Sequence, residues 1–205
     1  MARALTAARR RAANKDGAAA VEFAMLLPIL ITLFFGVVET SMALLCRADV
    51  SVMASTAADL ISQASTLTTG DINNVYSASG TILFPYYNPA DPSTAKPTIR
   101  ITSVIYDTVS HSTTSGKVGW TCVQAGSGTL SPGTRNPGDV VTFGPPLIPS
   151  SQPLMTANGS VIIAEIAYNY ASPTTKVIAG AINFTNNFVT KPRRVLQIAA
   201  PTGGC

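Results

Sequence analysis

The longest apolar stretch of the chain lies near its N-terminus and predicts a membrane-spanning helix. Residues 23–38 (FAMLLPILITLFFGVV) contain no charged side chain, and the apolar character continues past Glu39 to Cys46. A helix over residues 23–46 would be roughly 36 Å long, which covers a bilayer core of about 30 Å with some tilt. Beyond it, apolar residues recur at every third or fourth position. We therefore predict one helix, with a transmembrane part at 18–46 and a helical stalk at 47–66.

The pattern of residues 67–205 predicts a small extracytoplasmic domain of the α+β class. Asp71 is a plausible N-cap for a short second helix that reaches about Phe84, where Pro85 and Pro89 follow. Residues 126–159 are rich in Gly and Pro and are expected to form a loop. Residues 176–183 are interpreted as one or two helical turns. Helices followed by strands favour an antiparallel sheet, here of about four strands, at 97–107, 117–124, 160–170 and 188–199.

The charge of the chain is concentrated at its N-terminus. The formal net charge is +4, and residues 1–17 alone hold four Arg, one Lys and one Asp, so the remaining residues are neutral overall. A basic leader of this kind is no binding face for nucleic acid. Because positive residues stay on the cytoplasmic side, the N-terminus is expected inside and everything after about residue 47 outside.

A basic segment before an apolar run is also the outline of a cleaved secretory signal. Against that interpretation, the run is longer than the usual 7–15 residues, and only weak cleavage candidates follow, such as Val52-Met-Ala54. A plain membrane anchor is the other alternative, and it explains everything except the position of Glu22. A carboxylate at the border of a membrane segment is costly and suggests a function. The alternative is that Glu22 favours the helix dipole and reaches the headgroups. Glu39 is interpreted as a group at the outer interface, or one that pairs with Arg47 through water.

The stretch GAAAVEFAMLLP, followed by GVVE, resembles the N-terminus of the TadE-like family, the minor pseudopilins of tight-adherence (Tad, Flp-type) pilus systems. Ser41 stands where many relatives have Gly, which is a minor departure. The matching residues are Gly17, Val21, Glu22, Phe23, Ala24, Pro28, Gly36 and Glu39.

The resemblance implies a pilin-like layout, in which a helix precedes a sheet, and a defined maturation. A membrane prepilin peptidase would cut after Gly17, so that Ala18 becomes the first residue. Glu22 and Phe23 would then serve assembly, with the new amine of Ala18 on one subunit pairing with Glu22 of its neighbour.

The same resemblance implies a single-pass protein of the bacterial inner membrane that is required for pilus assembly and hence for adhesion. Its outer domain would be periplasmic or extracellular. The expected partners are the prepilin peptidase, other pilin or pseudopilin subunits, platform proteins and the membrane itself. The alternative is a bitopic protein whose outer domain binds a ligand or partner without filament assembly. Whether the protein enters the fibre, caps it or stays in the basal platform is left open.

Cys122 and Cys205 both lie on the expected outer side, where the compartment is oxidising. A disulfide between them would hold the C-terminus, and two free thiols are the alternative. Cys46 is expected to pack as a small apolar group. His111 is the only histidine and lies in a polar loop, and no catalytic or metal-binding pattern accompanies it. We therefore expect no enzyme activity, no metal and no cofactor.

Overall fold

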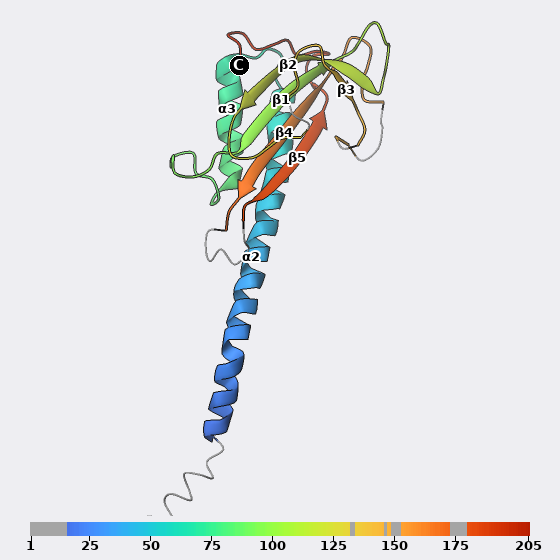
Figure 1. Ribbon diagram of the computed structural model, residues 1–205. Helices are drawn as coiled ribbons and strands as arrows, with labels where there is room; N and C mark the ends of the chain where they lie inside the picture. The colour runs from blue at the N-terminus through green and yellow to red at the C-terminus, as the bar shows by residue number, and fades with distance from the viewer. Residues whose placement is uncertain (1–15, 132–133, 146, 149–152, 173–179) are drawn as a thin grey trace, which may run out of the picture.

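The computed structural model describes residues 16–131, 134–145, 147–148, 153–172 and 180–205. One helix, α2 (Asp16–Ser62), runs the length of the molecule. Its N-terminal part projects alone, and its C-terminal part packs against the remaining residues, which we call the head (Figure 1). This arrangement confirms the predicted α+β class with a long N-terminal helix.

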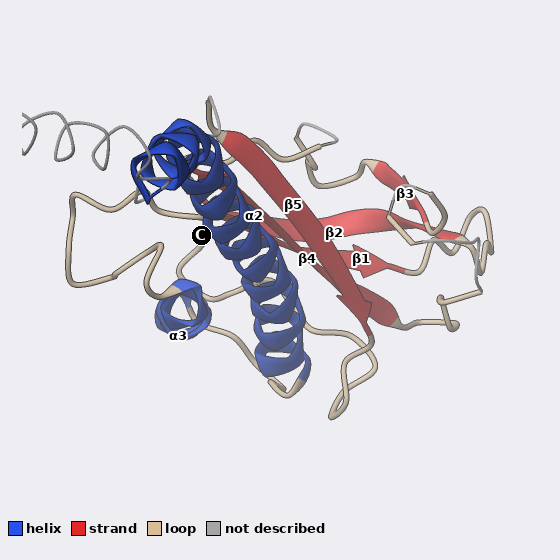
Figure 2. Ribbon diagram, turned by 90° about the horizontal axis from the view of Figure 1, so that it is seen from below, coloured by secondary structure: helices blue, strands red, loops and turns tan. Residues whose placement is uncertain are grey.

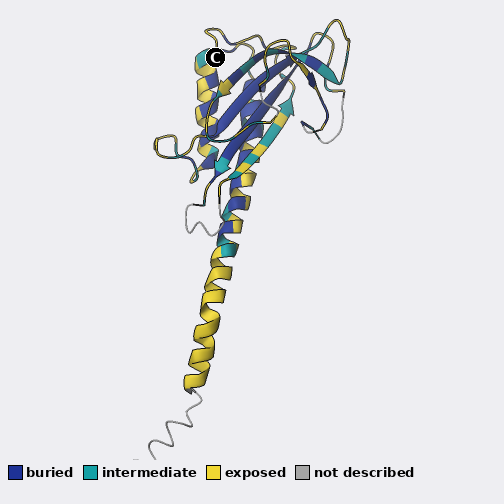
Figure 3. Ribbon diagram, viewed as in Figure 1, coloured by how far each residue is buried: buried dark blue, intermediate teal, exposed yellow. Residues whose placement is uncertain are grey.

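Helix α2 divides into two halves with different surroundings. Every residue from 17 to 35 is exposed, and from Glu39 onward one side of the helix is buried by the head (Figure 3). We call residues 17–38 the lower half and residues 39–62 the upper half. The buried residues of the upper half recur every three or four positions, singly up to Val50 and as adjacent pairs beyond it, as one face of a helix requires. They are Glu39, Ala43, Cys46, Val50, Met53, Ala54, Ala57, Ala58, Ile61 and Ser62.

The second helix, α3 (Thr69–Gly80), begins earlier than predicted and is followed by the 3-10 turn η1 (Thr81–Leu83). Thr68 is the N-cap, and Asp71 occupies the third position of the helix, from which its carboxylate accepts a hydrogen bond from the Thr68 backbone N–H. In return, the Asp71 backbone N–H donates to the Thr68 side-chain oxygen, and the two hydrogen bonds form a capping box. Asp71, predicted to be the N-cap, is therefore the third residue of the helix. The Thr68 contacts lower the pKa of Asp71 below its ordinary value.

The sheet contains five strands in the order β3-β2-β1-β4-β5, and every neighbouring pair is antiparallel. Two predictions about its extent were wrong. β3 lies within the segment expected to be loop, and the last strand begins at Ile182, before the predicted run 188–199, and ends at Thr190 within it. Residues 182–183, expected to be helical, belong to that strand, whereas 173–179 lie outside the described residues. The strands are β1 (Thr98–Ile105), β2 (Ser115–Gln124), β3 (Val140–Thr142), β4 (Ser160–Tyr170) and β5 (Ile182–Thr190).

Helix α2 crosses one face of the sheet, and α3 lies beside it (Figure 2). A large apolar core fills the space between them and includes Ile99, Trp120 and Ile166 from the strands. A second, smaller cluster lies on the opposite face, where Phe143 and Leu147 from the segment after β2 cover the sheet. The sheet therefore has apolar cover on both faces, and only the upper half of α2 contributes to it.

Candidate functional site

The residues expected to serve processing and assembly all lie on the lower half of α2. Gly17, Ala18, Glu22 and Phe23 are exposed. Within the described part of the chain, Glu22 has neither a hydrogen-bond nor an ion-pair partner. The helix is long and apolar enough to cross a membrane, with a mean hydropathy of 2.4 over its most apolar window. The lower half thus fits a single-pass membrane protein, and it presents on an apolar surface a carboxylate that has no partner among the described residues.

The predicted cleavage bond lies in the first turn of this helix. α2 begins at Asp16, so the bond between Gly17 and Ala18 is already within helical backbone. No heavy atom lies within 4 Å of the position that a Cβ of Gly17 would occupy. Glycine lowers the stability of a helix by roughly 1 kcal/mol relative to alanine, so this turn opens more easily than its neighbours. A peptidase that binds extended backbone would meet an accessible and weakly helical site.

Glu39 is buried by the head, which corrects its interpretation as an interfacial residue. The residue is 0% exposed, and the Ser172 hydroxyl donates a 2.7 Å hydrogen bond to its Oε1 atom. Ser172 follows β4, so this contact joins the helix to the head at the point where the two first meet. The sequence held a usable signal, because Glu39 continues the spacing of Ala43, Cys46 and Val50 on the buried face. Because Glu39 is charged, it was not assigned to the buried face of the helix.

The structure brings Cys122 and Cys205 together in a disulfide, with their Cα atoms 5.1 Å apart. Cys122 lies on β2, facing the large core, so the bond attaches the C-terminal segment to the middle of the sheet. Thr69 at the start of α3 holds the same segment, since its hydroxyl donates to the Gly204 carbonyl at 2.7 Å. Cys46 is buried in the same core and is a free thiol, in line with its expected packing role.

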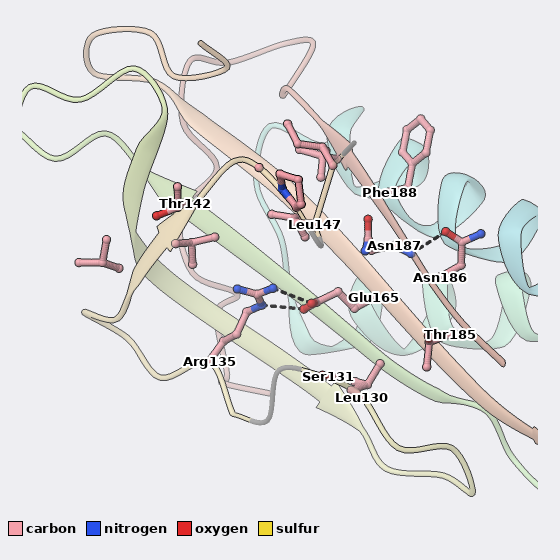
Figure 4. A pocket seen from close by; sticks show the side chains of 16 residues that line it. Leu130, Ser131, Arg135, Thr142, Leu147, Glu165, Thr185, Asn186, Asn187 and Phe188 are labelled. Carbon is pink, nitrogen blue, oxygen red and sulfur yellow. Dashed lines mark hydrogen bonds and ion pairs between the residues drawn. The ribbon is translucent and has the colours of Figure 1, made fainter. Parts of the chain in front are cut away.

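A buried charged cluster on the far face of the sheet was not foreseen from the sequence. Arg100 on β1 lies opposite Glu165 on β4, and its Nε atom is 2.7 Å from the carboxylate. Arg135, from the segment between β2 and β3, binds the same carboxylate through two nitrogens, at 2.6 and 2.8 Å (Figure 4). Burial raises the pKa of Glu165, but the hydrogen bonds and charges of the two guanidinium groups outweigh burial and hold the pKa below its ordinary value. The cluster fastens the loop that carries Arg135 to the sheet.

A groove of about 930 Å³ lies above this cluster. One wall is formed by residues 185–189 of β5, including Asn186 and Phe188, and the other by residues of the 140–148 segment such as Leu147 (Figure 4). The charged side chains at the base of the groove, Arg135 and Glu165, form an ion pair with each other. Among the residues that the structure describes, no group of three or more His, Cys, Asp and Glu side chains is placed to hold a metal ion.

The part of the chain that matches a known protein family lies within α2. The model of the family described as TadE-like protein matches residues 17–59. No curated protein and no solved structure matches the chain. The family match contains Glu22 of the lower half and the buried Glu39 of the upper half, and it ends three residues before the helix does. The resemblance expected from the sequence is confirmed over residues 17–59, where the chain matches the TadE-like family.

Proposed function

We propose that this chain is a minor pseudopilin-like protein required for assembly of a Tad-type pilus, and through it for adhesion to surfaces. The observation that carries the proposal is Glu22, an exposed carboxylate without a partner among the described residues, on an apolar helix that matches the TadE-like family. An ionisable group inside a membrane segment is costly unless it is paired, so this one calls for a partner outside the subunit.

The proposed membrane span is residues 17–38, which is shorter than the 18–46 expected from hydropathy. The head begins to bury α2 at Glu39, and a buried helix face is closed to lipid. Residues 17–38 form roughly 33 Å of helix, enough for a bilayer core of about 30 Å. The basic side chains within residues 1–17 support a cytoplasmic N-terminus, with the head in the periplasm or outside the cell. The inner membrane is the proposed location.

Cleavage by a prepilin peptidase after Gly17 would supply the missing partner. It removes the basic leader and creates an amine on Ala18, one helical turn from Glu22. Pairing this amine with Glu22 of a neighbour is a heterologous contact, which propagates into an open array of subunits. The partners in this scheme are the peptidase, other pilin or pseudopilin subunits, and the platform proteins of the pilus machine.

The mass of the membrane-extracted protein tests this proposal. In cells with an active prepilin peptidase, the parent chain is expected to lack residues 1–17. Gly17→Leu should keep them, because its side chain obstructs the cleavage site. Gly36→Leu is the matched control and should be processed like the parent, since Gly36 lies on the same helix with equally open space where a Cβ would stand. An intact leader on the parent chain would contradict the proposal.

The second candidate is a bitopic membrane protein whose head binds a ligand or partner without filament assembly. The groove between β5 and the 140–148 segment is the observation that favours it. The two candidates differ in processing, because a bitopic binding protein has no need to lose its leader. The neutral charge of residues 18–205 argues against a nucleic-acid partner for either.

A further inference from the structure

We propose that the turn formed by residues 84–87 (FPYY) contacts the lipid headgroup region of the outer leaflet and so sets the height of the head above the membrane. We call it the membrane-facing turn. The inference rests on the proposed membrane span of α2 and goes beyond it, since that span concerns only the lower half of the helix.

Hydrogen bonds fix the level of this turn along α2. After α2 ends at Ser62, the chain returns through α3 and η1 toward the lower half. The Tyr86 hydroxyl donates to the Met42 carbonyl at 2.9 Å, and the Tyr168 hydroxyl donates to the Tyr86 carbonyl at 2.9 Å. The turn is therefore held at the height of Met42 by contacts with both the helix and β4, at the end of the head that faces the lower half (Figure 1).

The height of Met42 corresponds to the headgroup layer of the proposed span. Met42 lies three residues beyond Glu39, or about 4.5 Å further along the helix. Polar headgroups add roughly 5–8 Å on each side of the hydrocarbon core. Val38 is the last residue before the head buries the helix, so we place the outer end of the hydrocarbon core there. Tyr86 then lies within the headgroup layer, and Phe84 is two residues away from it in the same turn.

The chemistry of the surface at this level fits lipid better than water. Phe84 is 66% exposed, and Leu44 and Leu45 of α2 are 61% and 60% exposed at about the same height. Residues 84–90 carry no charged side chain. Single exposed apolar residues are ordinary on protein surfaces. Here, however, Phe84, Leu44 and Leu45 extend the exposed apolar surface of the lower half beyond Glu39, where the head begins to bury the helix.

Tryptophan reporters in the full-length chain test the inference in bilayers whose lipids are brominated near the headgroup end of the acyl chain. Phe84→Trp places a reporter on the membrane-facing turn. Phe34→Trp reports on the span itself, and Val109→Trp, at a position 81% exposed between β1 and β2, reports on the far side of the head. The native Trp120 is buried and bound to the Ile198 carbonyl, so it contributes the same background to each. Unfolding temperatures equal to that of the parent establish that the variants are folded.

We expect the fluorescence loss at Phe84→Trp to exceed clearly the loss at Val109→Trp. Quenching at Phe34→Trp with no more loss at Phe84→Trp than at Val109→Trp would overturn this inference and leave the span intact. Absence of quenching at Phe34→Trp would instead overturn the proposed span. A Phe84→Trp reporter with blue-shifted emission that bromine does not quench would identify a protein partner, such as a second copy of this chain, and would likewise overturn the inference.

Discussion

Two carboxylates on the same helix have opposite surroundings. Glu22 lies on the lower half of α2, exposed and without a partner among the described residues, whereas Glu39 lies on the upper half, 0% exposed and bound by Ser172. Both stand within an apolar sequence, where an unpaired charge is expensive. The head supplies the partner of Glu39 within the subunit. The difference teaches that the head, which supplies a partner for Glu39, supplies none for Glu22 among the described residues.

The two halves of the helix differ in the same way as their carboxylates. The lower half is apolar on all sides and is exposed on all sides, which suits a lipid environment. The upper half has a buried stripe and an exposed face that includes Arg47 and Ser51. Experiments that separate the two halves should therefore give two distinct phenotypes, one of assembly and one of folding.

Glu22→Gln is expected to give the largest effect, the loss of pilus assembly with normal insertion and folding. Removing one member of a buried charge pair costs about 3–5 kcal/mol, enough to dissociate a weak subunit contact. The measurement is pilus display at matched membrane levels of each variant. Asp49→Asn, which removes a carboxylate from the upper half, is the control and should assemble normally. Equal piliation of Glu22→Gln and the parent would mean that Glu22 only favours the helix end, and the two carboxylates would then differ in burial alone.

Cys205→Ser should lower the free energy of unfolding of the head by about 2–4 kcal/mol, because the disulfide with Cys122 closes a long loop. Denaturant unfolding of the purified protein measures the change. Insertion of the lower half should be unaffected, since no part of the bond touches it. Mass mapping of non-reduced tryptic fragments tests the bond itself. If both thiols of the exported protein react with a labelling reagent, the disulfide is absent and this prediction fails with it.

Glu39→Ala should destabilise the head by about 1–3 kcal/mol, since it leaves the Ser172 hydroxyl without this acceptor and opens space beneath the head. Glu39→Gln should cost less, because an amide oxygen still accepts a hydrogen bond. Glu22→Ala is the matched control, and the same unfolding measurement should show no change for it. A head as sensitive to Glu22→Ala as to Glu39→Ala would remove the distinction between the two halves.

The smallest expected effect concerns the helix that packs beside the upper half. Thr68→Ala removes the side-chain cap of α3 and should lower the stability of the head by about 1 kcal/mol. Thr66→Ala, an exposed position just outside the capping box, should change it by much less. The comparison is made by thermal unfolding. Equal shifts for the two variants would show that the box contributes little beyond a general preference for threonine here.

Local features of the sequence predicted the elements whose stability is local. The apolar run and the three-four spacing predicted α2 within a few residues at each end, and the β-rich composition of residues 160–170 predicted β4 to the residue. Asp71 indicated the start of α3 to within three residues, although the N-cap is Thr68 and Asp71 is the third residue of the helix.

The strands that the sequence did not predict, β3 and β5, form because they pair with segments distant in the chain. The Asn-rich residues of β5 form a strand because β4 offers them a partner, whereas the more apolar segment around Val195 and Ile198 packs as irregular chain. β3 has only three residues and depends on β2 for its hydrogen bonds. Whether a segment forms a strand depends more on the neighbours that it packs against than on its own composition. The sequence therefore did not predict the bounds of β3 or of β5.

The sequence by itself determined that this protein has a long apolar helix with the TadE-like pattern and an unusual carboxylate at Glu22, because helix periodicity and charge are properties of neighbouring residues. Only the tertiary structure decided that Glu39 is enclosed, that Arg100 and Arg135 meet at Glu165, and that the turn at Phe84 returns to the level of Met42. Each of those outcomes joins residues far apart in the chain. Burial and pairing across such separations depend on how the head closes on the helix, and no local pattern records that.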